Sequence, residues 1–524
     1  MTDVSEADGA AAAGENKSGQ PVQRLKKNSV GLAGVVFMAV ATAAPITAMV
    51  GNIPIAIGFG NGSGAPAGYL VATIVLGLFG VGYAAMARHI TATGAFYGFI
   101  SHGLGRVLGM ASGTIITMAY VVFEASLVGI FSFFSHSTVE KYTGISVPWI
   151  VFALVMLAAN AILSYFDINL AAKVLGAFLV TEILMLGLMA VAVLVHGGGP
   201  DGFAVSSINP VNAFEPAAGV GGAVAGIGLF FAFWSWVGFE STAMYGEESR
   251  DPKRIIPRAI LLSVLGIGLF YVFVSWMAIA GTGPARAIEL AQDSSTSSEI
   301  FFGPTRDFVG GWAVSVFEVL LISGSFACGM AFHQCASRYI YALGREGLIP
   351  GSEGSVGRTH PVHGSPHIAS FVQTVMATAI VIAFAVAGMD PYIHLFGLLA
   401  ILGTMAILIV QSLCAFAVIG YFHVSRNHPE TANWFRTLLA PLLGGLGMLY
   451  VVYLLWENRS FAAGAAADTL LFRLSPYIVG GLFLFGMLVA VWYRYRAPER
   501  YARIGRIVLD DTPESEPEAE PSIK

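Results

Sequence analysis

The sequence predicts an all-α membrane protein with about twelve transmembrane helices. Hydrophobic residues make up 56% of the 524-residue chain, charged residues only 11%, and the mean hydropathy is +0.73. A soluble domain carries about 25% charged residues. Two stretches, 28–87 and 391–425, contain no Asp, Glu, Lys or Arg. Each is longer than the roughly 20 residues that cross a hydrocarbon core, so each must hold at least one span.

Apolar windows place the individual helices along the chain. The predicted spans are 29–57, 66–88, 107–135, 147–164, 171–196, 220–248, 256–281, 307–343, 367–389, 391–423, 435–457 and 474–496.

Basic residues divide unevenly between the two sides of these spans. One side carries Arg24, Lys26, Lys27, Arg88, Arg106, Lys173, Arg250, Lys253, Arg254, Arg258, Arg338, Arg345, Arg358, Arg426, Arg436 and the basic residues of 494–506. The other side carries only Lys141, Arg286, Arg306, Arg459 and Arg473. Because cytoplasmic loops are enriched in Lys and Arg, both termini are predicted to be cytoplasmic.

The two ends of the chain are polar. An Ala-, Gly- and Ser-rich leader precedes the first span, and acidic residues dominate 510–524. Residues 1–28 and 497–524 are therefore expected to be solvated tails without a fixed fold, and the leader does not fit a cleavable signal peptide. The three cysteines lie in apolar helices, which argues against a disulfide framework or a metal site. No metal, cofactor or nucleic acid partner is expected.

The first and sixth predicted spans are both interrupted. Pro45, Gly51 and Pro54 stand in the first, and the sixth breaks around 235–238. Proline removes a backbone donor, and glycine lowers the cost of leaving helical angles. Two breaks five spans apart are what an inverted repeat of five plus five helices predicts, with substrate bound between them. The alternative is a pair of ordinary kinks, which proline and glycine also produce in membrane helices.

Two long motifs carry a family resemblance. The first is GFESTAMYGEESRDPKRIIPRAI, 238–260, which follows the sixth span, and the second is SRYIYALGREGLIPGSEGSVGRTHPVHGSPHIAS, 337–370, which follows the eighth. Both resemble signatures of the amino acid–polyamine–organocation permeases, and they occur in the order and at the span numbers of that family. The resemblance extends over about 29–496.

The resemblance implies a fold of leucine-transporter type with two additional helices. The expected division is a cytoplasmic N-terminus (1–28), a transporter core (29–423) made of repeats 29–196 and 220–423, two accessory helices (424–496) and an acidic tail (497–524). In such folds the broken first helix holds the carboxylate of an amino acid, and the broken sixth helix holds its ammonium. Helix N-termini favour anions and C-termini favour cations, so this arrangement suits a zwitterion.

The predicted substrate site comprises both breaks. From the first break it takes the backbone of Ala44, Pro45, Ile46, Thr47, Ala48 and Met49, where the usual glycine-rich pattern of the family is missing. From the second break it takes Phe233, Trp234, Ser235 and Trp236. Trp234 matches a gating tryptophan of the family and is interpreted as an aromatic lid. Trp236 is expected to serve mainly in packing.

Three carboxylates within the predicted spans add hypotheses. Glu240 is either a gating carboxylate of the substrate site or a structural acid beside the break. Glu182 lies roughly 13 Å along its helix from Lys173, near the midplane, where a carboxylate costs about 3 kcal/mol. It matches a coupling position of a proton-coupled family member and is predicted to be the protonation site, the alternative being a permanently neutral acid. Glu124, near the centre of span three, is predicted to face a cargo with a second positive charge.

Further polar residues carry less information. His333 and His394 could relay protons, although a lone histidine between helices is more often a satisfied core residue. Ser323 and Ser325 could belong to a sodium site, but serine commonly bonds back to its own helix.

The sequence thus predicts a proton-coupled amino acid importer of the cell membrane. Its expected partners are an amino acid or amine, protons and the lipid bilayer. An amino acid antiporter, a polyamine importer and a transporter-like sensor are the alternatives. An enzyme is not expected, because no constellation of acids, bases or metal ligands converges.

Overall fold

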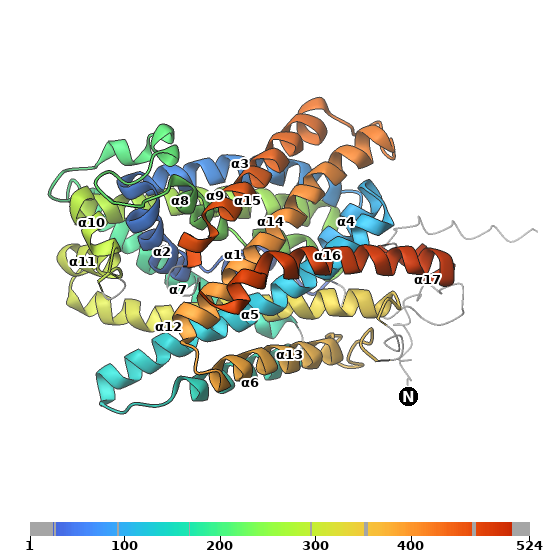
Figure 1. Ribbon diagram of the computed structural model, residues 1–524, viewed down its shortest axis with the longest axis horizontal. Coiled ribbons are helices and arrows are strands. Elements are labelled where there is room, and N and C mark those ends of the chain that lie inside the picture. The colour runs from blue at the N-terminus through green and yellow to red at the C-terminus, as the bar shows by residue number, and fades with distance from the viewer. Residues whose placement is uncertain are drawn as a thin grey trace, which may run out of the picture.

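The computed structural model describes residue 25 and residues 28–91, 94–166, 168–293, 296–349, 355–463 and 468–505. Within these ranges the chain forms helices and no β-sheet (Figure 1). The predicted tails fall largely outside them. Of residues 1–28 only Leu25 and Asn28 are described, and residues 506–524 are not. The start of the predicted C-terminal tail forms a short helix, α17 (Pro498–Arg503).

Twelve segments of the described chain run through the bundle. In chain order they are α1 and α2 (Leu32–Ala43, Pro45–Ile55), α3 (Ala65–Ala87), α5 (Arg106–Thr143), α6 (Trp149–Tyr165), α7 (Ile168–Val195), α8 and η5 (Ala225–Trp234, Phe239–Tyr245), α9 (Pro252–Thr282), α12 (Gly311–Arg345), α13 (His367–Val386), η6 and α14 (Pro391–Phe396, Gly397–Ile419), η8 and α15 (Trp434–Leu439, Ala440–Ala463) and α16 (Leu470–Arg496). The prediction of about twelve helices is confirmed.

Length and hydropathy alone identify nine candidate membrane-spanning stretches within the described residues. They account for ten of the twelve segments. The stretch Leu32–Ala87 contains two passes, since η1 (Ala56–Asn61) and η2 (Gly62–Gly64) turn the chain between α2 and α3. Helix α6 is apolar but only 17 residues long, and the sixth pass is broken into two short pieces.

Shorter helices were not predicted. They are α4 (Ala95–Gly103), α10 (Pro284–Ala291) and α11 (Glu299–Phe308), together with the 3₁₀ turns η3 (Val205–Ile208) and η4 (Pro210–Phe214), whereas the π-helical turn η7 (Gly420–Val424) continues α14 at the end of the predicted span 391–423. They connect the spans at the ends of the bundle, and they are too short for a hydropathy window of membrane length.

The outward faces of the peripheral helices are apolar. Helix α7 exposes Leu184 and Val195, and α16 exposes Phe485 and Leu488. A surface of this kind is stable only against lipid. The polar groups instead gather inside the bundle or at its ends. The end that carries α17 and the residues Arg88, Arg106, Arg345 and Arg494 is called the basic face below.

The fold is of leucine-transporter type. Each repeat begins with an interrupted helix, α1–α2 in the first and α8–η5 in the second, five spans apart. The breaks lie next to each other in the centre of the bundle, and α5 and α12 cross beside them (Figure 1). Irregular backbone is tolerated at this depth because protein, rather than lipid, surrounds it.

Candidate functional site

The first break lies at Ala44, between α1 and α2. Ala44 has φ 46° and ψ 73°, a left-handed conformation that costs a non-glycine residue about 1–2 kcal/mol. Pro45 is the first residue of α2, where a missing N–H does no harm. The break also frees carbonyls at the end of α1, and Tyr271 Oη of α9 donates to Ala43 O at 3.0 Å. The strained turn is therefore held by a neighbouring helix.

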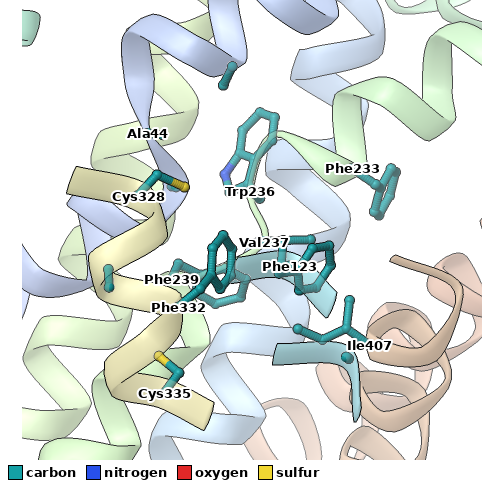
Figure 2. Packing of buried hydrophobic residues seen from close by; sticks show 14 of the residues in the cluster. Ala44, Phe123, Phe233, Trp236, Val237, Phe239, Cys328, Phe332, Cys335 and Ile407 are labelled. Atoms are coloured by element: carbon teal, nitrogen blue, oxygen red, sulfur yellow. The ribbon is translucent and has the colours of Figure 1, made fainter. Parts of the chain in front are cut away.

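Helix α12 approaches this break closely because of a glycine. A Cβ on Gly324 would lie 2.6 Å from Ile46 Cγ2 and 3.0 Å from Glu182 Oε1, so a larger residue would push the helices apart. One turn further along α12, Cys328 Sγ donates to Thr42 O at 3.1 Å. Figure 2 shows Cys328 beside the break.

Glu182 of α7 faces the start of α2. Its side chain is buried, with 1% exposed, and its Oε2 accepts a hydrogen bond from Ile46 N at 3.4 Å. Because Pro45 has no N–H, the Ile46 amide is the first donor of α2, and the carboxyl group lies at the positive end of that helix. The carboxylate predicted near the midplane is thus in contact with the first break.

The second break lies between Trp234, the last residue of α8, and Phe239, the first residue of η5. Gly238 has φ 124°, and a Cβ there would lie 2.6 Å from Thr42 Cβ. Only glycine combines this conformation with this approach of the two breaks.

Glu240 is bound to the second break itself. Gly238 N donates to Glu240 Oε1 and Oε2 at 3.1 and 3.0 Å, and Tyr120 Oη donates to Oε1 at 3.0 Å. A carboxyl group at the N-terminal end of a half-helix is electrostatically favourable. These contacts favour the structural interpretation of Glu240 over the gating one.

Ser235 connects three helices at the second break. Its Oγ donates to Phe231 O at 2.8 Å, accepts from Asn52 Nδ2 of α2 at 2.9 Å, and lies 2.7 Å from Tyr69 Oη of α3. Asn52 was not identified from the sequence, where it is a lone amide in an apolar run. The link from Asn52 to Ser235 ties the two broken helices together.

A cavity of about 30 Å³ lies between the breaks. It is lined by Thr42, Ala43, Ala44, Thr47, Ala48, Asn52, Leu127, Trp234, Ser235, Val237, Cys328, Phe332 and Phe396. No charged side chain is among these lining residues of the described chain. Thr47 Oγ1 is buried without a hydrogen-bond partner there. The cavity has room for about two water molecules, so this conformation is closed around an uncharged, mostly apolar space.

Aromatic rings cover the side of the cavity that faces away from the basic face. Trp234 stacks on Phe396 with ring centroids 5.5 Å apart and an interplanar angle of 30°. Trp236 points elsewhere, since its Nε1 donates to Val264 O at 3.3 Å and its ring packs against Tyr271. Trp234 therefore lines the cavity, whereas Trp236 packs against α9.

The predicted substrate residues divide into two groups. Ala44, Thr47, Ala48, Trp234 and Ser235 line the cavity, whereas Pro45, Ile46, Met49, Glu124, Phe233, Trp236 and Glu240 do not. The lining residues that the sequence did not identify are Thr42, Ala43, Asn52, Leu127, Val237, Cys328, Phe332 and Phe396. Most of them are small or apolar, and nothing in their local sequence distinguishes them from residues that face lipid.

Glu124 lies in a different part of the bundle from the one predicted. It is fully buried and bonded to Asn160, His333 and Gln373 of three other helices. Leu127, one turn later on α5, faces the cavity instead. The contacts of Glu124 therefore give no support to a direct contact with cargo.

The remaining polar candidates bond locally. His394 Nδ1 accepts from Asp390 N at the start of η6. Ser323 Oγ and Ser325 Oγ donate to the carbonyls of Leu320 and Leu321 in their own helix. These contacts fit the structural interpretation that was set beside the functional one for each residue.

Two buried ion pairs join α12 to the loop after η5 near the basic face. Arg338 makes a bidentate contact with Glu248, both distances being 3.0 Å, and Arg345 makes one with Glu247 at 2.9 and 2.7 Å. Both glutamates lie in the loop between η5 and α9, and both arginines lie on α12. The start of α1 is fixed to the same loop, because Val30 N donates to Glu248 O at 3.0 Å.

We expect Gly238→Ala to destabilise the protein by about 2–4 kcal/mol, because the new Cβ would meet Thr42 at a positive φ. The thermal unfolding midpoint in detergent measures the effect. Gly51→Ala is the matched control, since a Cβ at that helical position meets nothing within 4 Å. Equal midpoints for the two variants would contradict the close approach of the breaks.

The sequence of the chain is similar to those of several known transporters. The chain is 22% identical over 415 residues to the branched-chain amino acid permease BcaP of Bacillus subtilis (strain 168), covering 75% of this chain and 80% of that protein. It is 24% identical over 437 residues to the low-affinity putrescine importer PlaP of Escherichia coli (strain K12), covering 82% and 88%. It is 26% identical over 274 residues to the human b(0,+)-type amino acid transporter 1, covering 51% and 52%.

A solved structure shows the same fold. The crystal structure of a mutant of the Eremococcus coleocola manganese transporter matches with a TM-score of 0.58 at 12% identity, covering 90% of this chain and 94% of that chain. The model of the amino acid permease family matches residues 31–491. Because this match spans most of the sequence, the chain belongs to the amino acid permeases of the amino acid–polyamine–organocation superfamily, and it is a transporter rather than an enzyme.

Proposed function

We propose that this permease imports a zwitterionic amino acid with an apolar side chain, by alternating access and coupled to protons. One observation carries the proposal: the cavity between the two helix breaks is lined mainly by small and apolar residues, with the neutral polar side chains of Thr42, Thr47, Asn52 and Ser235 and, among the described residues, no charged side chain. Burying a second charge of a basic amino acid or a diamine there would cost several kcal/mol, since nothing in the lining would neutralise it.

The cavity offers separate groups for the three parts of such a substrate. The first turn of α2 and the unpartnered Thr47 Oγ1 suit the carboxylate. Carbonyl groups at the C-terminal ends of α1 and α8 suit the ammonium. Leu127, Phe332 and Phe396 offer an apolar surface to the side chain. The name of the Bacillus subtilis relative, a branched-chain amino acid permease, agrees with this class.

The basic face is proposed to be cytoplasmic in the cell membrane, with both termini on that side. Trp234 and Phe396 then close the cavity toward the outside, and the pairs of Glu247 and Glu248 with α12 close it toward the cytoplasm. During transport, the two sides of the cavity must open in turn.

We also propose that 29–423 is the transporter core, with repeats 29–196 and 220–423, and that 424–496 form accessory helices.

Glu182 is the proposed coupling site. It is the carboxyl group in contact with the start of α2, the segment that would bind the substrate carboxylate. Gain or loss of its proton changes the charge beside that segment by one unit. A neutral Glu182 favours the substrate anion, whereas an ionised Glu182 repels it.

Uptake into proteoliposomes tests the substrate class. We expect accumulation of labelled leucine when the outside is acidic, competition by isoleucine and valine, and no competition by arginine or putrescine. Competition by putrescine would support an amine importer instead. Uptake that needs internal amino acid and ignores the proton gradient would support an antiporter.

Trp234→Ala is expected to reduce this uptake about tenfold, because it removes the lid over the cavity. Trp312→Ala is the matched control, since Trp312 is exposed at the start of α12, away from the cavity. Equal losses in the two variants would contradict the lid. Absence of flux for every amino acid and amine would overturn the proposed function.

A further inference from the structure

Three histidines gather at the basic face, in the loop between α12 and α13. His360 and His363 belong to this loop, and His367 is the first residue of α13. The rings of His360 and His363 stack with centroids 4.6 Å apart, and the ring of His367 lies 5.2 Å from that of His360. Each ring would feel the charge of its neighbours, because like charges at this distance repel each other.

His360 holds the loop in a closed turn. Its Nδ1 accepts hydrogen bonds from Val362 N at 3.2 Å and from His363 N at 3.1 Å. Its own backbone N donates to Ser365 O at 2.8 Å. The chain is therefore folded around the imidazole ring, and this segment, 360–366, is called the histidine cap below.

The histidine cap is attached to the C-terminal end of α6. Because Nδ1 of neutral His360 is an acceptor, Nε2 carries the hydrogen atom and donates to Tyr165 Oη at 2.9 Å. Ser365 Oγ donates to Tyr165 O at 2.7 Å, and the ring of His363 packs against Phe166 with centroids 5.3 Å apart. Helices α6 and α13, which the cap joins at this end, lie side by side (Figure 1).

The cap lies next to the buried pair of Arg338 and Glu248. A cavity of about 10 Å³, with room for about one water molecule, lies between the cap, the end of α6 and this pair. Its lining consists of Ser164, Phe166, Glu248, Gln334, Arg338, His363, Gly364, Ser365 and Pro366. The cap and the ion pair thus enclose the same small space, and both side chains of the pair are at most 3% exposed.

Hydrogen bonds link the attachment point of the cap to the same pair. Ser164, the residue before Tyr165, accepts from Gln334 Nε2 at 2.9 Å. Gln334 Oε1 in turn accepts from Arg338 Nη1 at 2.6 Å, and Arg338 holds Glu248. Detachment of the cap from α6 would open the small cavity to water at the basic face. Two charges separate more easily when water solvates them.

Protonation of His360 is incompatible with the closed turn. A second proton must enter at Nδ1, where it would point at the N–H groups of Val362 and His363, so both hydrogen bonds would be lost. Desolvation and the nearby rings of His363 and His367 also lower the pKa of His360 below its ordinary value. The attached cap is therefore fully stable above about pH 6.5 and loses stability as the pH falls below that value.

The other ionisable groups around His360 do not stabilise a charged ring. They are Arg358 and His363 of the same loop, Tyr165 of α6, His367 of α13, and Glu248 and Arg338 beside the small cavity. The carboxylate in this described set is already paired with Arg338, so it offers little to an imidazolium ion. His360 itself is partly exposed, so its proton exchanges with water at the basic face.

We propose that the histidine cap is a pH-sensitive lid on the cytoplasmic side, attached while His360 is neutral and released when the cytoplasm becomes acidic. Release exposes the pair of Arg338 and Glu248 to water and favours opening toward the basic face. The proposal rests on the proposed orientation in the membrane and on no particular substrate.

Hydrogen–deuterium exchange of the full-length protein in lipid nanodiscs measures the attachment. After correction for the intrinsic pH dependence of exchange, the wild-type amides of 360–366 are expected to lose protection between about pH 7.5 and about pH 5.5. His360→Asn should keep the protection at both values, because asparagine Oδ1 accepts from the same N–H groups and does not titrate. His360→Ala should lack it at both, since no acceptor remains. Equal wild-type protection at the two values, or the same loss in His360→Asn, would overturn the switch.

His428→Asn is the matched control. His428 is another stacked histidine, with its ring centroid 4.1 Å from that of His89, but it belongs to a different loop. This variant should retain the pH-dependent protection of the cap. If His428→Asn removed the pH dependence, the sensor would lie outside the three histidines and the proposal would be wrong.

A second arm measures opening through the thiol of Cys328, which lines the substrate cavity, after Cys335 and Cys414 have been replaced by alanine. A maleimide is added from the basic side, and the labelling rate of this parent is divided by the rate of the same protein with His360→Asn. The pH dependence of the thiol itself cancels in this ratio. We expect a ratio of about one at about pH 8 and a several-fold higher ratio at about pH 6.

A ratio of one at both pH values would show that the cap does not control opening, and it would overturn the regulatory role. Neither arm uses a substrate, so failure of the proposed substrate class would leave both results unaffected.

Discussion

Glu182→Gln is expected to abolish proton-driven accumulation of substrate while exchange of internal for external substrate continues. The glutamine keeps an oxygen that can accept from Ile46 N, so the contact with the start of α2 survives. What is lost is the change of charge beside the break. A gradient of one pH unit is equivalent to about 1.4 kcal/mol, or tenfold accumulation for each proton carried. The accumulation ratio should fall from about tenfold to unity.

Accumulation and exchange are both measured in proteoliposomes, with and without an acidic exterior. Glu289→Gln is the matched control, because Glu289 is exposed on α10 and paired with Arg286, which is also exposed. It should behave like the wild-type protein. Undiminished accumulation in Glu182→Gln would rule out this residue as the coupling site, and loss of exchange as well would indicate a structural role.

The fold was largely predictable because its determinants are local. Proline acts on the residue before it, and the first break lies at Ala44, directly before Pro45. The second break was also predictable from a local determinant, because Gly238 itself adopts a positive φ that few other residues tolerate. The end of α5 was missed, since the predicted span stopped at 135 whereas the helix continues to Thr143. Those last eight residues are mostly polar, so the apolar stretch ends before the helix does.

The composition of the site was only partly predictable. Hydropathy gives the depth of a residue but not its direction around the helix, and α5 is apolar on most sides. Glu124 was therefore expected beside the substrate, whereas its side chain contacts Asn160, His333 and Gln373. Phe396 and Cys328 come from helices far away in the sequence, and only the packing distinguishes them from residues that face lipid.

The contact between Arg338 and Glu248 is expected to control opening toward the basic face. It joins α12 to the loop after η5, and the same loop holds the start of α1 through Glu248 O. Both side chains are at most 3% exposed. Removing one partner of a buried pair costs about 3–5 kcal/mol, because the other charge is left uncompensated. Glu248→Gln should therefore shift the population toward the open state by about a hundredfold or more.

The thiol of Cys328 reports this opening, since it lines the cavity and is 3% exposed in the closed conformation. With Cys335 and Cys414 replaced by alanine, a maleimide added from the basic side should label Glu248→Gln much faster than the parent. Asp251→Asn is the matched control on the same face, because its pair with Arg254 is largely exposed and such pairs contribute little.

The double variant Glu248→Gln/Arg338→Gln separates the ion pair from other effects of the glutamate. With both charges removed, no unpaired charge remains in the closed state, so labelling should be slower than in Glu248→Gln alone. If the double variant is labelled as fast as the single one, the effect comes from the loop rather than from the pair. If Glu248→Gln is protected like the parent protein, the pair does not hold the closure, and the second pair, Arg345 with Glu247, must carry it.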